Sequence, residues 1–282
     1  MKKATAILFS LLVSLLVSLL VGCGGPSPSS DPNVTAPAPK VHKSLFAGTP
    51  GYILQFDKNS FKPGLNAQDD LGLSVAIAMD VSGSMADSPK SQPDGTPKYI
   101  QSTKALGTIA NYLEELAKSH KNMKIQICIL RFNDRVQEVL PLTTLDAEGI
   151  AKLNDAINPD NFQPNGGTAI GSAMEVESEI LAQSGTVFNS LFIVTDGENN
   201  VNPDPKDVMK AIYSNRNNIS TDEFQVETST QMTSFVGFDV HSPQFSEFKN
   251  LGARVASADN QAEIEAGLKG FLEADIKNLE NK

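Results

Sequence analysis

Short apolar runs alternate along this chain with longer segments of helical periodicity, and this alternation restricts the possible folds more than any other feature. Four runs are too short for helices and are typical of strands covered on both faces. They are residues 71–79, 124–130, 191–195 and 232–238. Between and after them, apolar side chains recur at the spacing of a helix face. The alternation predicts a doubly wound α/β domain, with a mostly parallel sheet and helices on both faces.

The helical segments fall in the gaps between these runs and after the last of them. The clearest cover residues 106–117, 170–181 and 264–279, and weaker candidates cover 204–212 and 243–251. Residues 135–140 follow the second strand so closely that they can only return beside it, which predicts one antiparallel edge strand. Residues 254–258 are expected to form a final edge strand, and residues 52–56 a further strand whose place the sequence does not indicate.

The first 22 residues are interpreted as a signal peptide. Lys2 and Lys3 precede an apolar stretch, which is the order of a basic n-region and an apolar h-region. The tetrapeptide LVGC at residues 20–23 resembles the lipobox of bacterial lipoprotein precursors. This resemblance implies that residues 1–22 are removed and that Cys23 is lipidated and becomes the first residue.

An uncleaved transmembrane anchor is the alternative, because the apolar stretch is nearly as long as the roughly 20 residues that span a bilayer. That interpretation leaves Cys23 without a role, so we favour the lipoprotein. In both cases the rest of the chain is exported and tethered to the membrane of a bacterial cell envelope. Gly24 follows the cysteine where an aspartate could stand, and in bacteria with two membranes this pattern resembles lipoproteins sent to the outer membrane.

The composition changes after the anchor. Residues 23–47 are rich in proline and serine and have almost nothing to bury, so we expect a lipidated Cys23 followed by an extended tether. Residues 48–282 contain no second linker and no repeat, which predicts one folded domain with its core at about residues 70–282. The formal net charge is -10 and no basic run is present, so nucleic acid is not an expected partner.

Polar residues with metal-binding chemistry stand where strands end. The first strand runs into Asp80, Ser82 and Ser84, and the third runs into Asp196. Thr168 stands just before the predicted helix that follows the hairpin. The carboxyl ends of parallel strands meet at one edge of a sheet, so we expect these carboxylates and hydroxyls to gather there. Oxygen donors without sulfur or imidazole favour a hard divalent cation.

The segments DVSGS, GGTAIG and VTDGE together resemble the metal-ion-dependent adhesion site of the von Willebrand factor type A domain. The resemblance covers about residues 70–282 and implies a Rossmann-like sheet of strand order 3-2-1-4-5-6. In that family the serines and the threonine contact the ion directly or through water, the aspartates act mostly through water, and one coordination position stays open. The ligands implied here are Asp80, Ser82, Ser84, Thr168 and Asp196.

An incomplete coordination shell explains the expected function. Two aspartates roughly neutralise a divalent cation, while neutral hydroxyls withdraw little of its Lewis acidity, so an incoming Glu or Asp side chain gains a strong contact. Mg²⁺ is the expected ion, because few protein ligands and retained waters suit it, with Mn²⁺ and Ca²⁺ as alternatives. We therefore expect an envelope-anchored lipoprotein that binds an acidic side chain of a protein partner through the ion, in adhesion or in the assembly of a complex.

A metal-dependent phosphohydrolase of the haloacid dehalogenase type is the alternative function. Those enzymes also bind Mg²⁺ at strand ends, but they need a second aspartate two positions after the nucleophile, where Ser82 stands here. The chain also has no GxSxG, P-loop or HExxH motif. We therefore predict a binding module and not an enzyme.

Residues around these motifs receive secondary roles. Residues 85–98 form a proline-containing insert that predicts an irregular loop beside the metal, which either shapes the choice of partner or is simply solvated. Four further residues are candidates for groups that contact the metal ligands rather than the ion. They are Asp87, Asp94, Glu198 and Asn199. A solvated acidic face is expected from Glu175, Glu177 and Glu179, and Cys128 is expected to be a small core residue.

Overall fold

Seven strands form one sheet in the part of the chain that the computed structural model describes, which comprises residues 41–42, 72–93, 95–186, 188–217, 230–240 and 243–280. The strands are β1 (Val41–His42), β2 (Gly72–Asp80), β3 (Lys124–Phe132), β4 (Val136–Thr144), β5 (Phe188–Thr195), β6 (Thr230–Phe238) and β7 (Arg254–Ala258). They lie in the order β1-β4-β3-β2-β5-β6-β7. Counted without the two-residue β1, the strands follow the predicted order 3-2-1-4-5-6.

Most neighbouring strands run parallel. β2 pairs in parallel with both β3 and β5, and β6 pairs in parallel with β5 and β7. β4 is antiparallel to β3, because the connection between them is too short for a crossover. The predicted antiparallel strand is confirmed as β4. It is not the outermost strand, because the two-residue β1 pairs along its other side. The strand predicted at residues 52–56 falls outside the described residues.

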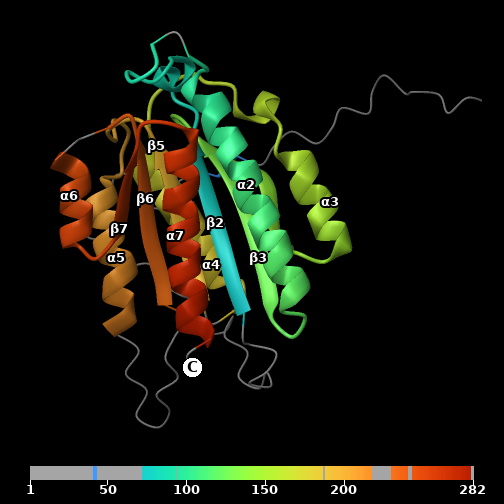
Figure 1. Ribbon diagram of the computed structural model, residues 1–282. Helices are drawn as coiled ribbons and strands as arrows, with labels where there is room; N and C mark the ends of the chain where they lie inside the picture. The colour runs from blue at the N-terminus through green and yellow to red at the C-terminus, as the bar shows by residue number, and fades with distance from the viewer. Residues whose placement is uncertain are drawn as a thin grey trace, which may run out of the picture. The chain divides into compact units, whose positions relative to one another are not determined.

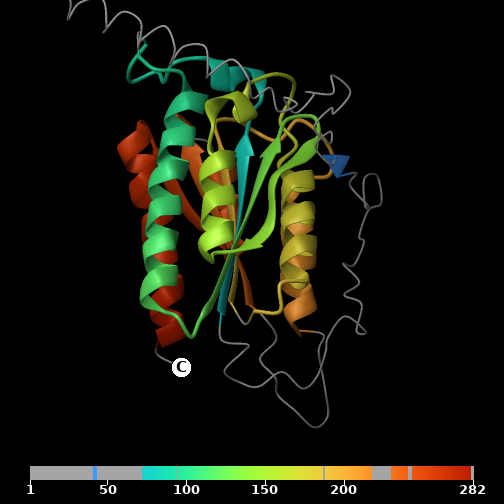
Figure 2. The ribbon, with the colours of Figure 1, turned by 90° about the vertical axis from the view of Figure 1, so that its right-hand side faces the viewer.

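The helices form a layer on each face of this sheet. They are α2 (Lys98–Ser119), α3 (Ala147–Ala156), α4 (Ile170–Ala182), α5 (Pro205–Asn217), α6 (Pro243–Asn250) and α7 (Gln261–Glu280), with the short 3-10 helices η1 (Gly83–Ala86) and η2 (Pro159–Phe162). Figures 1 and 2 show α2 and α7 against one face and α4 and α5 against the other. The predicted helices on both faces are therefore confirmed. No helix in the described part of the chain is long and apolar enough to cross a membrane.

β2 runs between both helical layers, and all nine of its residues are buried. Val75 and Ile77 belong to the apolar core that includes residues of α2 and α7, whereas Ala76 and Ala78 belong to the core of α4 and α5. Successive side chains of a strand point to opposite faces, so a strand between two layers has to be apolar on both. Cys128 is fully buried in the neighbouring β3, as predicted.

The helices α3 and η2 are not among the predicted elements. Asp146 caps the amino end of α3, where its Oδ1 accepts a hydrogen bond from Gly149 N at 2.8 Å. Leu153 is buried in the core and Ile150 packs against it. Two large apolar side chains are too few for a clear periodic signal, but the aspartate that caps the helix is a sequence signal that could have located it.

The predicted solvated face of α4 is wrong for two of its three glutamates. Glu175 and Glu177 are 3% and 0% exposed, whereas Glu179 is exposed. The reason is that α4 contacts α5 as well as several strands, so little of its surface reaches solvent. Burial raises the pKa of the Glu177 carboxyl well above its usual range. Burial therefore favours the neutral form of the Glu177 carboxyl in the core.

We expect Glu177→Gln to make the protein more stable than wild type in alkaline solution and to change its stability little in acid. The unfolded chain loses this proton near the ordinary pKa of 4.5, whereas burial keeps it in the folded state. The contribution of Glu177 to stability is therefore full below that pKa and is lost as the pH rises towards the raised one. Thermal midpoints measured between about pH 5 and pH 9 test this, with the exposed Glu179→Gln as the control. The same pH dependence in wild type and Glu177→Gln would contradict it.

Candidate metal centre

The loops that follow β2 and β5 meet the loop before α4 at one edge of the sheet. β2 and β5 are parallel neighbours, so their carboxyl ends lie side by side. Backbone hydrogen bonds join the three loops: Asn165 N donates to Val81 O at 2.7 Å, Gly83 N to Gly166 O at 3.1 Å, and Asn200 N to Thr168 O at 3.0 Å. These backbone hydrogen bonds hold the three loops against one another.

Asp80, the last residue of β2, is only 1% exposed. Its Oδ1 accepts a hydrogen bond from Ser82 N at 2.7 Å, and its Oδ2 accepts one from Thr195 Oγ1 at 2.5 Å. Burial raises the pKa of the Asp80 carboxyl to about 7; the Thr195 hydrogen bond opposes this rise, and the negative charge of Asp196 adds to it. The carboxylate is thus fixed in orientation and short of positive charge.

Two serines connect Asp80 to Asp196. Ser82 is buried at the residue before η1, and its Oγ lies 3.2 Å from Ser84 Oγ. Ser84 is exposed, and its Oγ donates to Asp196 Oδ1 at 2.8 Å. Both hydroxyls therefore lie on the side of this loop that faces Asp196.

Thr168 is buried beside the loop that contains Asp196. Its backbone N donates to Asn200 Oδ1 at 2.7 Å. A Cβ atom built on Gly197 would lie 3.6 Å from Thr168 Oγ1, so these two segments are in contact. The structure therefore brings all five residues predicted as ligands to one edge of the sheet.

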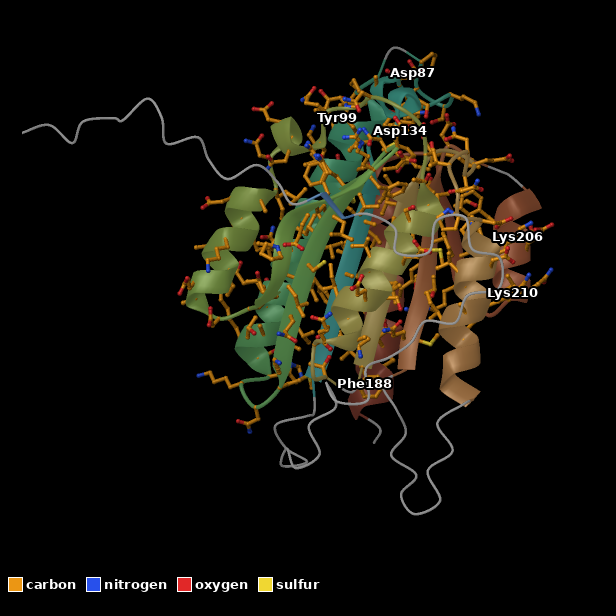
Figure 3. The ribbon with its side chains drawn as sticks, turned by 180° about the vertical axis from the view of Figure 1, so that it is seen from behind. Asp87, Tyr99, Asp134, Phe188, Lys206 and Lys210 are labelled. Atoms are coloured by element: carbon orange, nitrogen blue, oxygen red, sulfur yellow. The ribbon has the colours of Figure 1, made fainter. Side chains whose placement is uncertain are left out.

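Asp134, in the hairpin between β3 and β4, shapes the loop before Thr168. Its Oδ1 accepts a hydrogen bond from Gly167 N at 2.9 Å, and a Cβ on Gly167 would lie only 2.6 Å from that oxygen. Gly166 has a φ of +74°, which favours glycine. Figure 3 shows Asp134 and Asp87 at this end of the molecule and Phe188, the start of β5, at the opposite end. Sequence reasoning missed Asp134, although its position after a parallel strand was an available signal.

Two asparagines after β5 support the amino end of α4. Ala169, the residue before this helix, makes no side-chain capping bond. Instead Asn199 Oδ1 accepts a hydrogen bond from Gly171 N at 3.3 Å, and Asn200 holds Thr168 as described above. Asn199 was among the predicted supporting groups and Asn200 was not. Of the other candidates, Asp87 and Glu198 are exposed, and Asp94 lies outside the described residues.

The insert before α2 is anchored over the ends of β6 and β7. Lys90 N donates to Asp239 Oδ2 at 3.2 Å, and Ser91 Oγ donates to the backbone oxygen of Asp259 at 2.8 Å. Within the insert, Ser88 Oγ donates to Gly95 O at 2.6 Å. The predicted loop is therefore irregular but bonded to the sheet edge beside the candidate centre.

A buried lysine also contacts this centre, and sequence reasoning missed it. Lys98 Nζ lies 2.6 Å from Asp196 Oδ2 and 3.9 Å from Asp239 Oδ2. Lys98 begins α2 and Asp239 follows β6, so both stand at the same sheet edge as the predicted ligands. The charged environment of Asp196 thus includes a cation that belongs to the protein itself.

The donor chemistry at this edge suits a hard cation. Two carboxylates, those of Asp80 and Asp196, stand with hydroxyls that carry no charge. Among the described residues, no three His, Cys, Asp or Glu side chains come together to hold an ion. An ion at this edge would therefore depend on hydroxyl and water oxygens as well as on the two aspartates.

Comparison with known proteins agrees with this architecture. Residues 74–251 match the von Willebrand factor type A domain. No curated protein matches the chain. Similar solved structures include a von Willebrand factor type A protein from Catenulispora acidiphila, with 17% identity and a TM-score of 0.51, covering 74% of this chain and 43% of that one.

Two bacterial pilus proteins have the same fold. The pilus adhesin SpaC from Lactobacillus rhamnosus GG is 15% identical, with a TM-score of 0.52, covering 74% of this chain and 31% of that one. The PilB minor pilin from Streptococcus sanguinis is 12% identical, with a TM-score of 0.52, covering 74% of this chain and 62% of that one. This chain thus spans less than two thirds of each of the three solved proteins. Because the match covers more than half of the chain, this protein belongs to the von Willebrand factor type A domain family.

Proposed function

We propose that this protein is a lipid-anchored component of a bacterial cell envelope whose domain binds a divalent cation and, through it, an acidic side chain of a protein partner. Mg²⁺ is the proposed ion, with Mn²⁺ and Ca²⁺ as alternatives. The proposed ligands are Asp80, Ser82, Ser84, Thr168 and Asp196. Adhesion and the assembly of an envelope complex both use such a contact.

The convergence of two carboxylates and several hydroxyls at one sheet edge carries this proposal. Asp80 and Asp196 come from different strands, and Ser84 bonds directly to Asp196 at 2.8 Å. The pKa of Asp80 is raised to about 7 by burial and by the neighbouring carboxylate, so a cation would relieve an uncompensated negative charge. Bound there, a divalent ion supplies Lewis acidity for an incoming carboxylate.

The chain's own residues would hold the ion rather than attack a substrate. A phosphohydrolase needs a nucleophilic carboxylate that reaches the phosphorus atom. Asp80 is 1% exposed, and both of its oxygens accept hydrogen bonds within the protein. Ser82 stands where the general acid of those enzymes would be. These features favour a binding module.

Partner binding is also in keeping with the proteins that share this fold. A pilus adhesin and a minor pilin are among them. Their likeness supports an exposed binding role only as an analogy, because the shared feature is the fold. The insert lies at the same edge and adds surface beside the proposed contact.

Calorimetric titration of Mg²⁺ and Mn²⁺ into the purified protein tests the ion. We expect one ion to bind each chain, and EDTA to reverse the heat signal. A working extracellular site has a dissociation constant of about 1 mM or below. A protein that binds neither ion at concentrations of up to about 10 mM would therefore contradict the proposed function.

The lipid anchor has its own test. We expect Cys23→Ser to leave an unprocessed precursor and to abolish incorporation of labelled palmitate, because Cys23 supplies the sulfur to which the lipid is attached. Cys128→Ser is the control, since that thiol is fully buried. Mass spectrometry of the mature amino terminus decides between the alternatives. A wild-type chain that starts elsewhere, or that carries no acyl group, would refute the lipoprotein assignment.

A further inference from the structure

One oxygen of Asp196 is already paired with a cation of the protein. Lys98 Nζ lies 2.6 Å from Asp196 Oδ2, and the two side chains are 8% and 0% exposed. Within the described residues this oxygen has no hydrogen-bond partner, so the ion pair is its polar contact. The other oxygen, Oδ1, accepts the Ser84 hydroxyl on the side of the proposed ion. Asp196 thus lies between the lysine and the proposed metal site.

The position of Lys98 is set by the segments that meet around it. Its backbone N donates to Asp87 O at 2.9 Å, which ties the first residue of α2 to the insert. Asp239, at the end of β6, lies 3.9 Å from the ammonium and also accepts a bond from Lys90 N. The Lys90 side chain is 84% exposed, so solvent screens its charge. Of the two lysines near Asp239, Lys98 is therefore the one whose charge is shielded from solvent.

A shielded charge has a large effect on a neighbouring ion. Exclusion of water from Lys98 and Asp196 lowers the local dielectric constant, which strengthens both the attraction within the pair and the repulsion of a second cation. A divalent cation that approaches Asp196 meets this repulsion. It also competes with Lys98 for the negative charge of a single carboxylate.

We propose that Lys98 is a resident counter-cation that competes with the divalent ion for Asp196 and thereby lowers the ion affinity of the site. The proposal rests on the proposed function, because it presumes that the ion binds beside Asp196. With Lys98 close by, an ion-loaded site keeps more positive charge to offer an acidic ligand. Binding of the ion and binding of the partner's acidic side chain then depend strongly on each other.

The charge-removing variant Lys98→Met tests this inference, because methionine keeps much of the side-chain length. We expect Mn²⁺, titrated calorimetrically into the purified protein, to bind Lys98→Met at least about tenfold more tightly than wild type. Lys98→Arg keeps the charge and should retain the wild-type affinity. Lys104→Met removes an exposed lysine from the same helix and is the matched control, with no change expected.

A second test uses the wild-type protein and so does not require any variant to fold. Acetylation by an N-hydroxysuccinimide ester, followed by mass spectrometry, reports how freely each lysine reacts. We expect Lys98 to react several-fold faster when Mn²⁺ is bound, because the ion weakens the Lys98–Asp196 pair. Lys104 is exposed and should react at the same rate with and without Mn²⁺.

The outcomes separate this inference from the proposed function. If wild type binds Mn²⁺ and Lys98→Met binds it no more tightly, or if Lys98 reacts at the same rate with and without Mn²⁺, the competition is refuted while the metal site stands. If neither protein binds Mn²⁺, both proposals fail. Binding of Mn²⁺ by Lys98→Met but not by wild type would support the competition and would contradict the proposed function of the wild-type protein.

Discussion

Replacing either aspartate at the sheet edge should reduce the affinity for Mg²⁺ or Mn²⁺ by about 100-fold or more, since each variant removes one of two negative charges that hold the ion. The variants are Asp80→Ala and Asp196→Asn. Thr168→Ala removes one neutral oxygen, so we expect a loss of only about tenfold. Titration calorimetry of the purified proteins measures all three.

The Asp80→Ala protein should remain folded. Asp80 is buried with a raised pKa, so its removal takes away a carboxylate whose desolvation opposes folding. Asp155→Ala, which removes an exposed carboxylate from α3, is the control for a general change in net charge. Undiminished ion binding by a folded Asp80→Ala protein would rule out the assigned ligand set.

The second large expected effect is that a chelator dissociates the complex with the protein partner. If an acidic side chain of another protein completes the coordination shell, EDTA should abolish the complex, and Mg²⁺ or Mn²⁺ should restore it. Changing that Glu or Asp of the partner to its amide should have the same effect as EDTA. Moderate salt should weaken the complex less, because the contact is made to a partly desolvated ion rather than between screened surface charges.

The alternative function makes the opposite prediction. A phosphohydrolase would turn over a generic phosphate ester in the presence of Mg²⁺, would lose that activity in Asp80→Asn, and would need no stable protein partner. Affinity capture of the intact protein from its own envelope, with and without EDTA, can be combined with an assay of phosphate release. Metal-dependent turnover lost in Asp80→Asn would overturn the binding function, whereas an EDTA-sensitive complex without turnover would support it.

The insert shows where sequence reasoning reached its limit. Prolines and a turn-forming pair predict an irregular loop, and the structure has one. The anchoring bonds from Lys90 and Ser91 lead to Asp239 and Asp259, which are more than one hundred residues away in the chain. No local pattern reports which distant oxygen a loop will meet. The same limit explains why the contacts of Lys98 and Asp239 were not predicted.

The glutamates of α4 illustrate the same point within one helix. Their spacing is compatible with a solvated face, and charged residues are seldom buried. Glu177 is nevertheless fully buried, because α4 contacts α5 as well as the sheet. A helix that is packed on more than one side has little surface in contact with solvent, so the prediction of a solvated acidic face was wrong for Glu177.

The sequence by itself determined the alternation of the main strands and helices and the ligand candidates that follow β2 and β5. Both follow from local chemistry, because short apolar runs must be covered on two faces and polar residues stop them. The tertiary structure alone decided which charges surround those residues. The pairing of Lys98 with Asp196 joins the start of α2 to the end of β5, and it exists because the sheet order makes β2 and β5 neighbours. Electrostatic contacts depend on distance in space, which the spacing of residues along a chain does not express.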